Sequence, residues 1–122
     1  MKSIELNVNS GKSNIIVGES IDNMLNYLPS GRTIIITDIN LNRIYNSKIV
    51  DFDIIEIGVG ESIKTLDTVN YIIQELIRLE ADRSTFIVGF GGGLVCDVTG
   101  LVASVFMRGL KLVQRQKALD NG

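Results

Sequence analysis

Glycines are clustered between Thr85 and Gly100, where a short apolar run gives way to an apolar stretch that begins at Leu94. The clustered residues are Gly89, Gly91, Gly92 and Gly93. Glycine tolerates positive φ and has no Cβ, so backbone N–H groups can approach a ligand closely. A strand, a glycine turn and a helix in this order are typical of sites that bind the diphosphate of a nucleotide. A nucleotide cofactor is therefore the first functional hypothesis.

The spacing of these glycines also allows a simpler interpretation. The strict G-x-G-x-x-G dinucleotide pattern, counted from Gly89 through Gly91, would need a third glycine where Leu94 stands. The glycines could then serve only to turn a strand sharply into a helix. We favour the diphosphate site, but the spacing alone leaves both interpretations open.

Three polar residues follow the glycine turn, and each has a structural alternative. Asp97 either complements the positive end of a helix dipole or contacts the cofactor, because an acid in an apolar helix needs a partner. Cys96 is interpreted as a small buried residue without a catalytic role, since the chain has no histidine to activate it. Arg108 and Gly109 are typical of a helix carboxyl terminus and its cap.

Two further segments carry candidate ligand groups. Asp38 and Asn40 follow a β-branched run at 33–37, and an acid at a strand end often contacts ribose. The loop Gly60-Glu-Ser-Ile-Lys64 stands beside a helix start, where Glu61 and Lys64 could reach ribose or adenine. The alternative is that this loop is only solvated.

The pattern of apolar residues predicts alternating strands and helices. Alternation at 4–8 and the run at 14–18 predict an amino-terminal β-hairpin. Further strands are expected at 33–37, 53–57, 86–88 and 110–114, and helices at 20–28, 41–47, 65–77 and 94–106. Repeated β–α units predict an α/β fold with a Rossmann-like, open, mostly parallel sheet and helices on both faces. Asp38, Glu61 and the glycine turn should then share the carboxyl edge of the sheet, where ligands bind.

Length and composition exclude several classes of protein. A chain of 122 residues with 45% hydrophobic content suits a single domain. A net charge of −2 without a basic cluster argues against nucleic acid as a partner. One cysteine and no histidine leave no usual means of building a metal site. The amino terminus does not resemble a signal peptide and the stretch 94–107 falls short of a membrane span, so we expect a cytoplasmic protein without a membrane partner.

Taken together, these segments resemble the 3-dehydroquinate synthases, a family of sugar-phosphate cyclases related to the glycerol dehydrogenases. The resemblance covers residues 1–114 and is carried by four ordered motifs, at 37–40, 60–66, 91–100 and 106–114. It implies an NAD-binding domain whose cofactor contacts are Asp38, Asn40, Val59, Gly60, Glu61, Ser62, Ile63, Lys64, Gly91, Gly92, Gly93, Leu94, Val95, Cys96 and Asp97. It also gives Arg108 a second interpretation, as the arginine that reaches the substrate phosphate across a dimer interface.

The resemblance implies an activity as well. Members of the family convert 3-deoxy-D-arabino-heptulosonate 7-phosphate to 3-dehydroquinate and phosphate, in the shikimate pathway of aromatic amino acid biosynthesis. Bound NAD transiently oxidises a substrate hydroxyl, and a zinc or cobalt ion acts as a Lewis acid. The metal ligands, a Glu and two His, belong to a helical second domain that this chain lacks. No residue of this chain is therefore assigned as catalytic.

The chain departs from the family pattern at two places. Cys96 stands where the family usually has glycine. After Gln114 the expected Val-Pro-Thr-Thr is absent, so residues 115–122 are interpreted as a divergent tail and the isolated chain is expected to be inactive. We expect homodimers or other self-association through exposed apolar surface. The alternatives are a fragment of another sugar-phosphate cyclase or a glycerol-dehydrogenase-like enzyme, and a non-catalytic nucleotide-binding relic.

Overall fold

The computed structural model describes residues 5–9, 13–17, 25, 31–60 and 65–121 of the chain. Their strands form one five-stranded sheet with the order β2-β1-β5-β3-β4. The bounds are β1 Glu5–Asn9, β2 Ser13–Val17, β3 Thr33–Asp38, β4 Asp53–Ile57 and β5 Phe86–Gly91. β3 pairs in parallel with both β4 and β5, whereas β1 pairs antiparallel with β2 and β5. The connection between β1 and β2, residues 10–12, lies outside the described residues.

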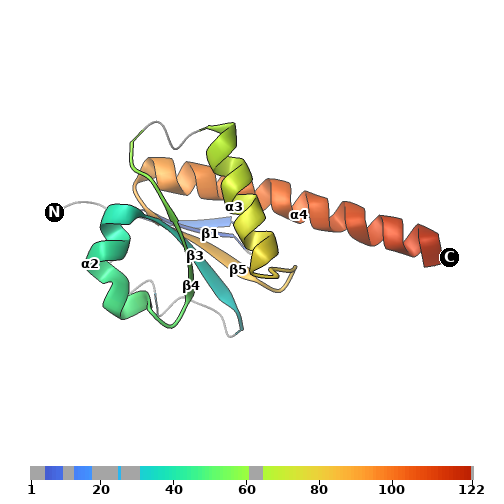
Figure 1. Ribbon diagram of the computed structural model, residues 1–122, viewed down its shortest axis with the longest axis horizontal. Helices are drawn as coiled ribbons and strands as arrows, with labels where there is room; N and C mark the ends of the chain where they lie inside the picture. The colour runs from blue at the N-terminus through green and yellow to red at the C-terminus, as the bar shows by residue number, and fades with distance from the viewer. Residues whose placement is uncertain (1–4, 10–12, 18–24, 26–30, 61–64, 122) are drawn as a thin grey trace.

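Helices cover both faces of the parallel strands (Figure 1). The helices are α2 Ile39–Ile49, α3 Leu66–Arg78 and α4 Gly93–Asn121. Successive strand residues point to opposite faces, so Ile34, Ile36 and Ile87 pack with α3 and α4, whereas Ile35 and Val88 pack with α2. β-branched residues suit strands buried on both faces, and the strands predicted at 33–37, 53–57 and 86–88 are confirmed.

The order of the strands places a topological switch point between β3 and β5. The chain passes from β3 through α2 to the adjacent β4, and then through α3 back across β3 to β5. β3 is followed by α2 on one face of the sheet, whereas β5 is followed by α4 on the opposite face. Open α/β sheets bind ligands in the crevice at such a point, beyond the carboxyl ends of the strands. The hydroxyl of Thr37 donates a 2.7 Å hydrogen bond to the carbonyl of Phe90, which ties the two strands together there.

The predicted helices at 41–47 and 65–77 are present, with small shifts of their ends. The Thr65 hydroxyl accepts a hydrogen bond from the N–H of Thr68 and caps α3, and Asp67 lies in its first turn. The helix predicted at 20–28 lies outside the described residues, except for Leu25, which is helical.

The predicted strand at 110–114 is wrong, because α4 continues as one helix from Gly93 to Asn121. Arg108 and Gly109 therefore lie inside the helix and do not end it. Gly109 costs a helix about 1 kcal/mol relative to alanine, but it does not terminate a helix by itself. The following Gln, Arg, Lys, Ala and Leu are good helix formers, and no proline intervenes. The last turns of α4 extend beyond the sheet in Figure 1.

One part of α4, Gly93–Leu110, is long and apolar enough to cross a membrane when judged by length and composition alone. The apolar segment is thus longer than the stretch 94–107 expected from the sequence. Its apolar side is nevertheless occupied by the sheet, because Val95, Val98, Val102 and Phe106 are buried in the core. This packing is that of a core helix in a globular domain.

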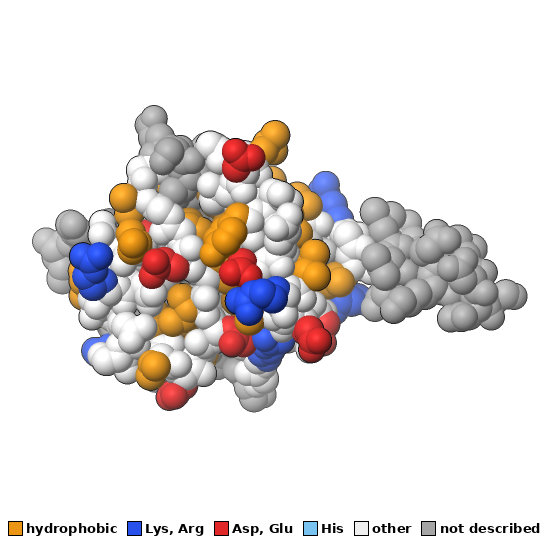
Figure 2. All heavy atoms as spheres, viewed as in Figure 1, with side chains coloured by type: hydrophobic (Ala, Val, Ile, Leu, Met, Phe, Trp, Pro, Cys, Tyr) orange, Lys and Arg blue, Asp and Glu red, His pale blue; other side chains and the backbone are white. Residues whose placement is uncertain are grey.

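Charges of both signs are mixed on the face of the molecule shown in Figure 2, with hydrophobic side chains between them. Two exposed ion pairs are found among the described residues, Arg32 with Asp53 at 2.9 Å and Arg78 with Glu75. Exposed pairs of this kind contribute little to the stability of a fold. The fold therefore depends mainly on the packing of helices on the sheet.

Candidate functional site

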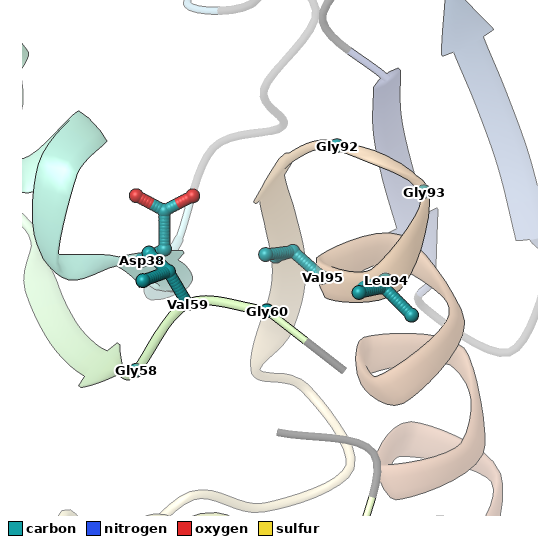
Figure 3. Close-up of a pocket in the computed structure, with 8 residues that line it drawn as sticks. All are labelled: Asp38, Gly58, Val59, Gly60, Gly92, Gly93, Leu94 and Val95. Carbon is teal, nitrogen blue, oxygen red and sulfur yellow. The ribbon is translucent and has the colours of Figure 1, made fainter. Parts of the chain in front are cut away.

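A cavity of about 200 Å³ lies beyond the carboxyl ends of β3, β4 and β5. Its walls come from three strand ends and from the first turn of α4 (Figure 3). The lining residues are Asp38, Gly58, Val59, Gly60, Gly92, Gly93, Leu94 and Val95. Segments that are far apart in the sequence therefore meet at the switch point of the sheet.

The glycine turn brings the backbone to the edge of this cavity. A Cβ added to Gly91 would lie 2.7 Å from Val95 Cγ2, so the absence of a side chain there allows the turn to pack on α4. A Cβ added to Gly92 would meet nothing within 4 Å and would stand in open space beside the helix start. The turn thus combines both roles considered from the sequence, a close helix–strand contact at Gly91 and an unobstructed backbone at Gly92.

The amino terminus of α4 presents unpaired backbone donors to the same cavity. Cys96 N–H bonds to the carbonyl of Gly92 at 3.1 Å, so the N–H groups that precede it have no acceptor within the helix. The dipole of a long helix adds a partial positive charge at this end. Backbone N–H groups and a positive dipole end are the usual means of binding a phosphate.

Asp38 faces the glycine turn across the cavity (Figure 3). It ends β3 and is the N-cap of α2, where its Oδ1 accepts a 2.8 Å hydrogen bond from the N–H of Leu41. Its side chain is partly exposed, and the carboxylate keeps further acceptor capacity for a ligand. The cap fixes the orientation of the carboxylate, so a structural role and a binding role are compatible in this residue.

The third wall is the chain that follows β4. Gly60 adopts a φ of 88°, a left-handed conformation that favours glycine, and this turns the chain along the cavity after Val59. The predicted contacts Glu61, Ser62, Ile63 and Lys64 come next in the sequence and lie outside the described residues. Gly58, which the sequence analysis did not select, also lines the cavity, and its position directly after β4 was the available signal.

Five of the described candidate site residues do not line this cavity, and one of them is Gly91, which is buried at the end of β5. Asn40 is exposed in the first turn of α2. Cys96 is buried, with its Sγ 3.8 Å from the carbonyl oxygen of Gly91. Asp97 lines a neighbouring cavity of about 280 Å³ instead. Arg108 is exposed on α4, about 22 Å from the helix start at a rise of 1.5 Å per residue.

The neighbouring cavity lies between the start of α3 and the first turns of α4. It is lined by Thr65, Leu66, Val69, Asp97, Val98 and Leu101, and the sequence analysis missed it. Its walls come from two helices whose pairing depends on the sheet, so sequence periodicity alone could not locate it.

The described part of the chain contains no group of three or more His, Cys, Asp or Glu side chains that could hold a metal ion. The donor set for a catalytic zinc or cobalt ion is therefore not found there.

Comparison with known proteins places this site in a family. The sequence profile of the 3-dehydroquinate synthase N-terminal family matches residues 54–119, which include Val59, Gly60 and the whole glycine turn. The chain belongs to the 3-dehydroquinate synthase family. The resemblance noted from the four motifs is thereby confirmed, and the matched residues continue past Gln114.

Curated relatives extend the similarity to nearly the whole chain. The chain is 33% identical to the 3-dehydroquinate synthase of Dehalococcoides mccartyi over 132 residues, which cover 98% of this chain and 37% of the relative. It is 34% identical to that of Blochmanniella floridana, over 93% of this chain and 35% of the relative. It is 40% identical to that of Dictyoglomus turgidum, over 66% of this chain and 23% of the relative. The chain thus spans about 37% of the length of the first of these 3-dehydroquinate synthases.

Proposed function

We propose that this chain forms the NAD-binding part of a 3-dehydroquinate synthase, the enzyme that converts 3-deoxy-D-arabino-heptulosonate 7-phosphate to 3-dehydroquinate and phosphate. The observation that carries the proposal is the cavity at the switch point, where the glycine turn faces Asp38 in a member of this family. Neither the fold nor the charge distribution favours a second function.

The residues at the cavity fit a dinucleotide in three respects. The N–H groups at the start of α4 would hold the diphosphate, and the open space at Gly92 lets it approach the backbone. Asp38 would accept hydrogen bonds from ribose hydroxyls at the end of β3. Val59 and Gly60 would lie along the cofactor. At about 200 Å³ the described walls enclose only part of a dinucleotide, since whole ligand sites are usually about 300–1,000 Å³.

Each protein group would then bind and orient, and none would perform the chemistry. Bound NAD supplies a reversible hydride acceptor. The described residues offer no cluster of side chains that could hold a metal ion. The other residues of the proposed contact set, Asn40, Glu61, Ser62, Ile63, Lys64, Cys96 and Asp97, and Arg108 as a phosphate ligand, stay predictions of the resemblance. We also propose a cytoplasmic location, without a nucleic acid or membrane partner.

Calorimetric titration of NAD into the purified chain tests the proposal. We expect saturable binding that Gly92→Val weakens about tenfold or more, because a side chain there would stand between the phosphate and the backbone. Gly109→Val is the matched control, since a Cβ at Gly109 also meets nothing within 4 Å and lies far along α4. Wild-type affinity in Gly92→Val would contradict the proposal, as would no binding by the wild-type chain.

A second variant separates the two roles of Asp38 in the same titration. Asparagine is as good an N-cap as aspartate, so Asp38→Asn should keep α2 and the melting temperature nearly unchanged. It removes the charge that would accept ribose hydroxyls and should weaken NAD binding several-fold. Asp51→Asn, at an exposed position after α2, controls for the loss of one negative charge.

A further inference from the structure

Two walls of the cavity beyond the sheet are the ends of adjacent strands. β3 and β5 pair in parallel, and the last pair of their register joins Thr37 to Phe90. The chain reaches the cavity one residue later on β3, at Asp38, and two residues after Phe90 on the other wall, at Gly92. The Thr37–Phe90 pair is therefore the last pair of the two strands before the cavity.

The side chain of Thr37 makes a contact that its strand does not need for burial. Thr37 is fully buried, and it follows three isoleucines at 34–36 that are equally buried. Valine would fill the same space, because it is β-branched like threonine. The Thr37 hydroxyl instead donates a 2.7 Å hydrogen bond to the carbonyl oxygen of Phe90. This bond joins a side chain of β3 to the main chain of β5, in addition to the pairing of the two strands.

Phe90 is the last residue with a side chain before the glycine turn, and it is held from two sides. Its carbonyl accepts the hydrogen bond from Thr37, and its ring packs edge-to-face on Tyr45 with the ring centroids 5.5 Å apart. Tyr45 belongs to α2, the helix whose N-cap is Asp38. The residue before the glycines is thereby fixed to the strand and to the helix that carry Asp38 on the other wall.

The hydrogen bond acts on the first peptide group of the glycine turn. The carbonyl of Phe90 and the N–H of Gly91 belong to one planar peptide group, so a bond to that carbonyl fixes the orientation of the whole group. The residues at 91–93 are all glycine, which has the greatest backbone freedom of any residue. The direction in which this turn leaves β5 therefore depends on the group that Thr37 holds.

We propose that Thr37 is a positioning residue of the cofactor site, which holds the glycine turn at the correct separation from Asp38. This inference rests on the proposed function. A diphosphate at Gly92 and a ribose at Asp38 belong to one ligand, so the ligand binds both walls only at one separation. Thr37 is buried beneath the cavity and acts through the two walls. Its hydroxyl keeps them in place before the ligand arrives, and preorganisation of this kind raises affinity.

Calorimetric titration of NAD into the full chain tests this role with Thr37→Val, which keeps the branched shape and removes the hydroxyl. We expect the affinity to fall about fivefold or more, because the ligand must then order the glycine turn itself. Thr37→Ser keeps the hydroxyl donor and removes one methyl group. It should bind NAD within about twofold of the wild-type affinity.

Thr85→Val is the matched control for a loss of stability alone. Thr85 is 1% exposed and lies directly before β5, at the opposite end of the strand from the glycine turn. Its hydroxyl accepts a 3.0 Å hydrogen bond from the N–H of Asp82, so valine removes a buried hydrogen bond there as well. Thr85→Val should lower the melting temperature and leave the affinity for NAD unchanged.

A double-variant cycle provides a second measurement that a purely structural role would not change. If Thr37 places the glycine turn relative to Asp38, the loss of affinity caused by Asp38→Asn should be smaller in the Thr37→Val background. The combined loss is then less than the product of the two single losses. Two independent effects would multiply.

The outcomes separate this inference from the proposed function. Wild-type affinity in Thr37→Val, in a chain whose Gly92→Val variant binds weakly, would overturn the inference alone. An equal loss of affinity in Thr37→Ser or in Thr85→Val would overturn it as well, because the hydroxyl of Thr37 would not be the cause, and so would independent losses in the cycle. A wild-type chain that binds no NAD would overturn the proposed function and this inference with it.

Discussion

At the scale of single residues, the contact between Gly89 and Thr99 explains why position 89 requires glycine, and it buries a hydroxyl group that has no hydrogen-bond partner in the described structure. A Cβ on Gly89 would lie 2.6 Å from Thr99 Oγ1, so Gly89 lets α4 approach β5 closely. The Thr99 hydroxyl is itself buried and has no hydrogen-bond partner in the described structure. A buried hydroxyl without a partner costs free energy that an apolar group of the same shape does not.

Thr99→Val should therefore raise the free energy of unfolding by about 1 kcal/mol. Valine keeps both branches at Cβ and removes only the unpaired hydroxyl. Urea denaturation followed by circular dichroism measures the change. Thr99→Ala is the control, because it removes the hydroxyl but also leaves a small cavity, and it should be less stable than Thr99→Val. A valine variant no more stable than the wild type would show that the hydroxyl has a partner in solution.

At the scale of elements, α3 ends in a motif that its sequence does not suit. The N–H of Ala81 bonds to the carbonyl of Leu76 and the N–H of Glu80 to that of Ile77, both at 2.9 Å. These two bonds form a Schellman motif, which requires a left-handed residue after the C-cap. Glu80 occupies that position with a φ of 58°, where glycine is the usual residue.

Glu80→Gly should stabilise the protein by about 0.5–1 kcal/mol. The left-handed conformation costs a residue with a Cβ about 1–2 kcal/mol, and the greater freedom of glycine in the unfolded chain offsets part of this gain. Thermal melting measures the effect. Glu80→Ala retains the Cβ and should stay close to the wild type, so an equal gain in both variants would assign the effect to the lost charge instead of the backbone.

At the scale of the whole molecule, the chain has a cavity at the carboxyl edge of its sheet but spans only 37% of the length of its Dehalococcoides mccartyi relative. The described residues enclose a cavity of about 200 Å³, smaller than the dinucleotide proposed to bind there, and contain no cluster of metal ligands. We therefore expect this chain to bind NAD without catalysing the reaction of the full-length enzyme.

The purified chain should release no phosphate from 3-deoxy-D-arabino-heptulosonate 7-phosphate above background, even with NAD and zinc or cobalt present. The expectation follows from the missing donor set, since the chain contains no histidine at all. A phosphate assay measures it, with the full-length Dehalococcoides mccartyi relative as the positive control. Steady turnover by the chain alone would show that the catalytic groups lie within these 122 residues.

The sequence by itself determined the local features of this protein. β-branched runs specified β3, β4 and β5, the apolar period and Thr65 specified α3, and the glycine cluster specified the turn into α4. These features depend on side chains within a few residues of one another, so the local sequence pattern predicts them. Four ordered motifs were also enough to identify the family.

Only the tertiary structure decided which of these residues meet. Because of the strand order, Asp38 lies close to the glycine turn. Because of the way the helices pack, Asp97 lines a different cavity and Arg108 lies on an exposed face. The segment at 110–114 has an apolar pattern that both a strand and a helix can use, and it continues α4. These arrangements depend on contacts between segments that are distant in the sequence. The free energies of such contacts cannot be predicted from a local sequence pattern.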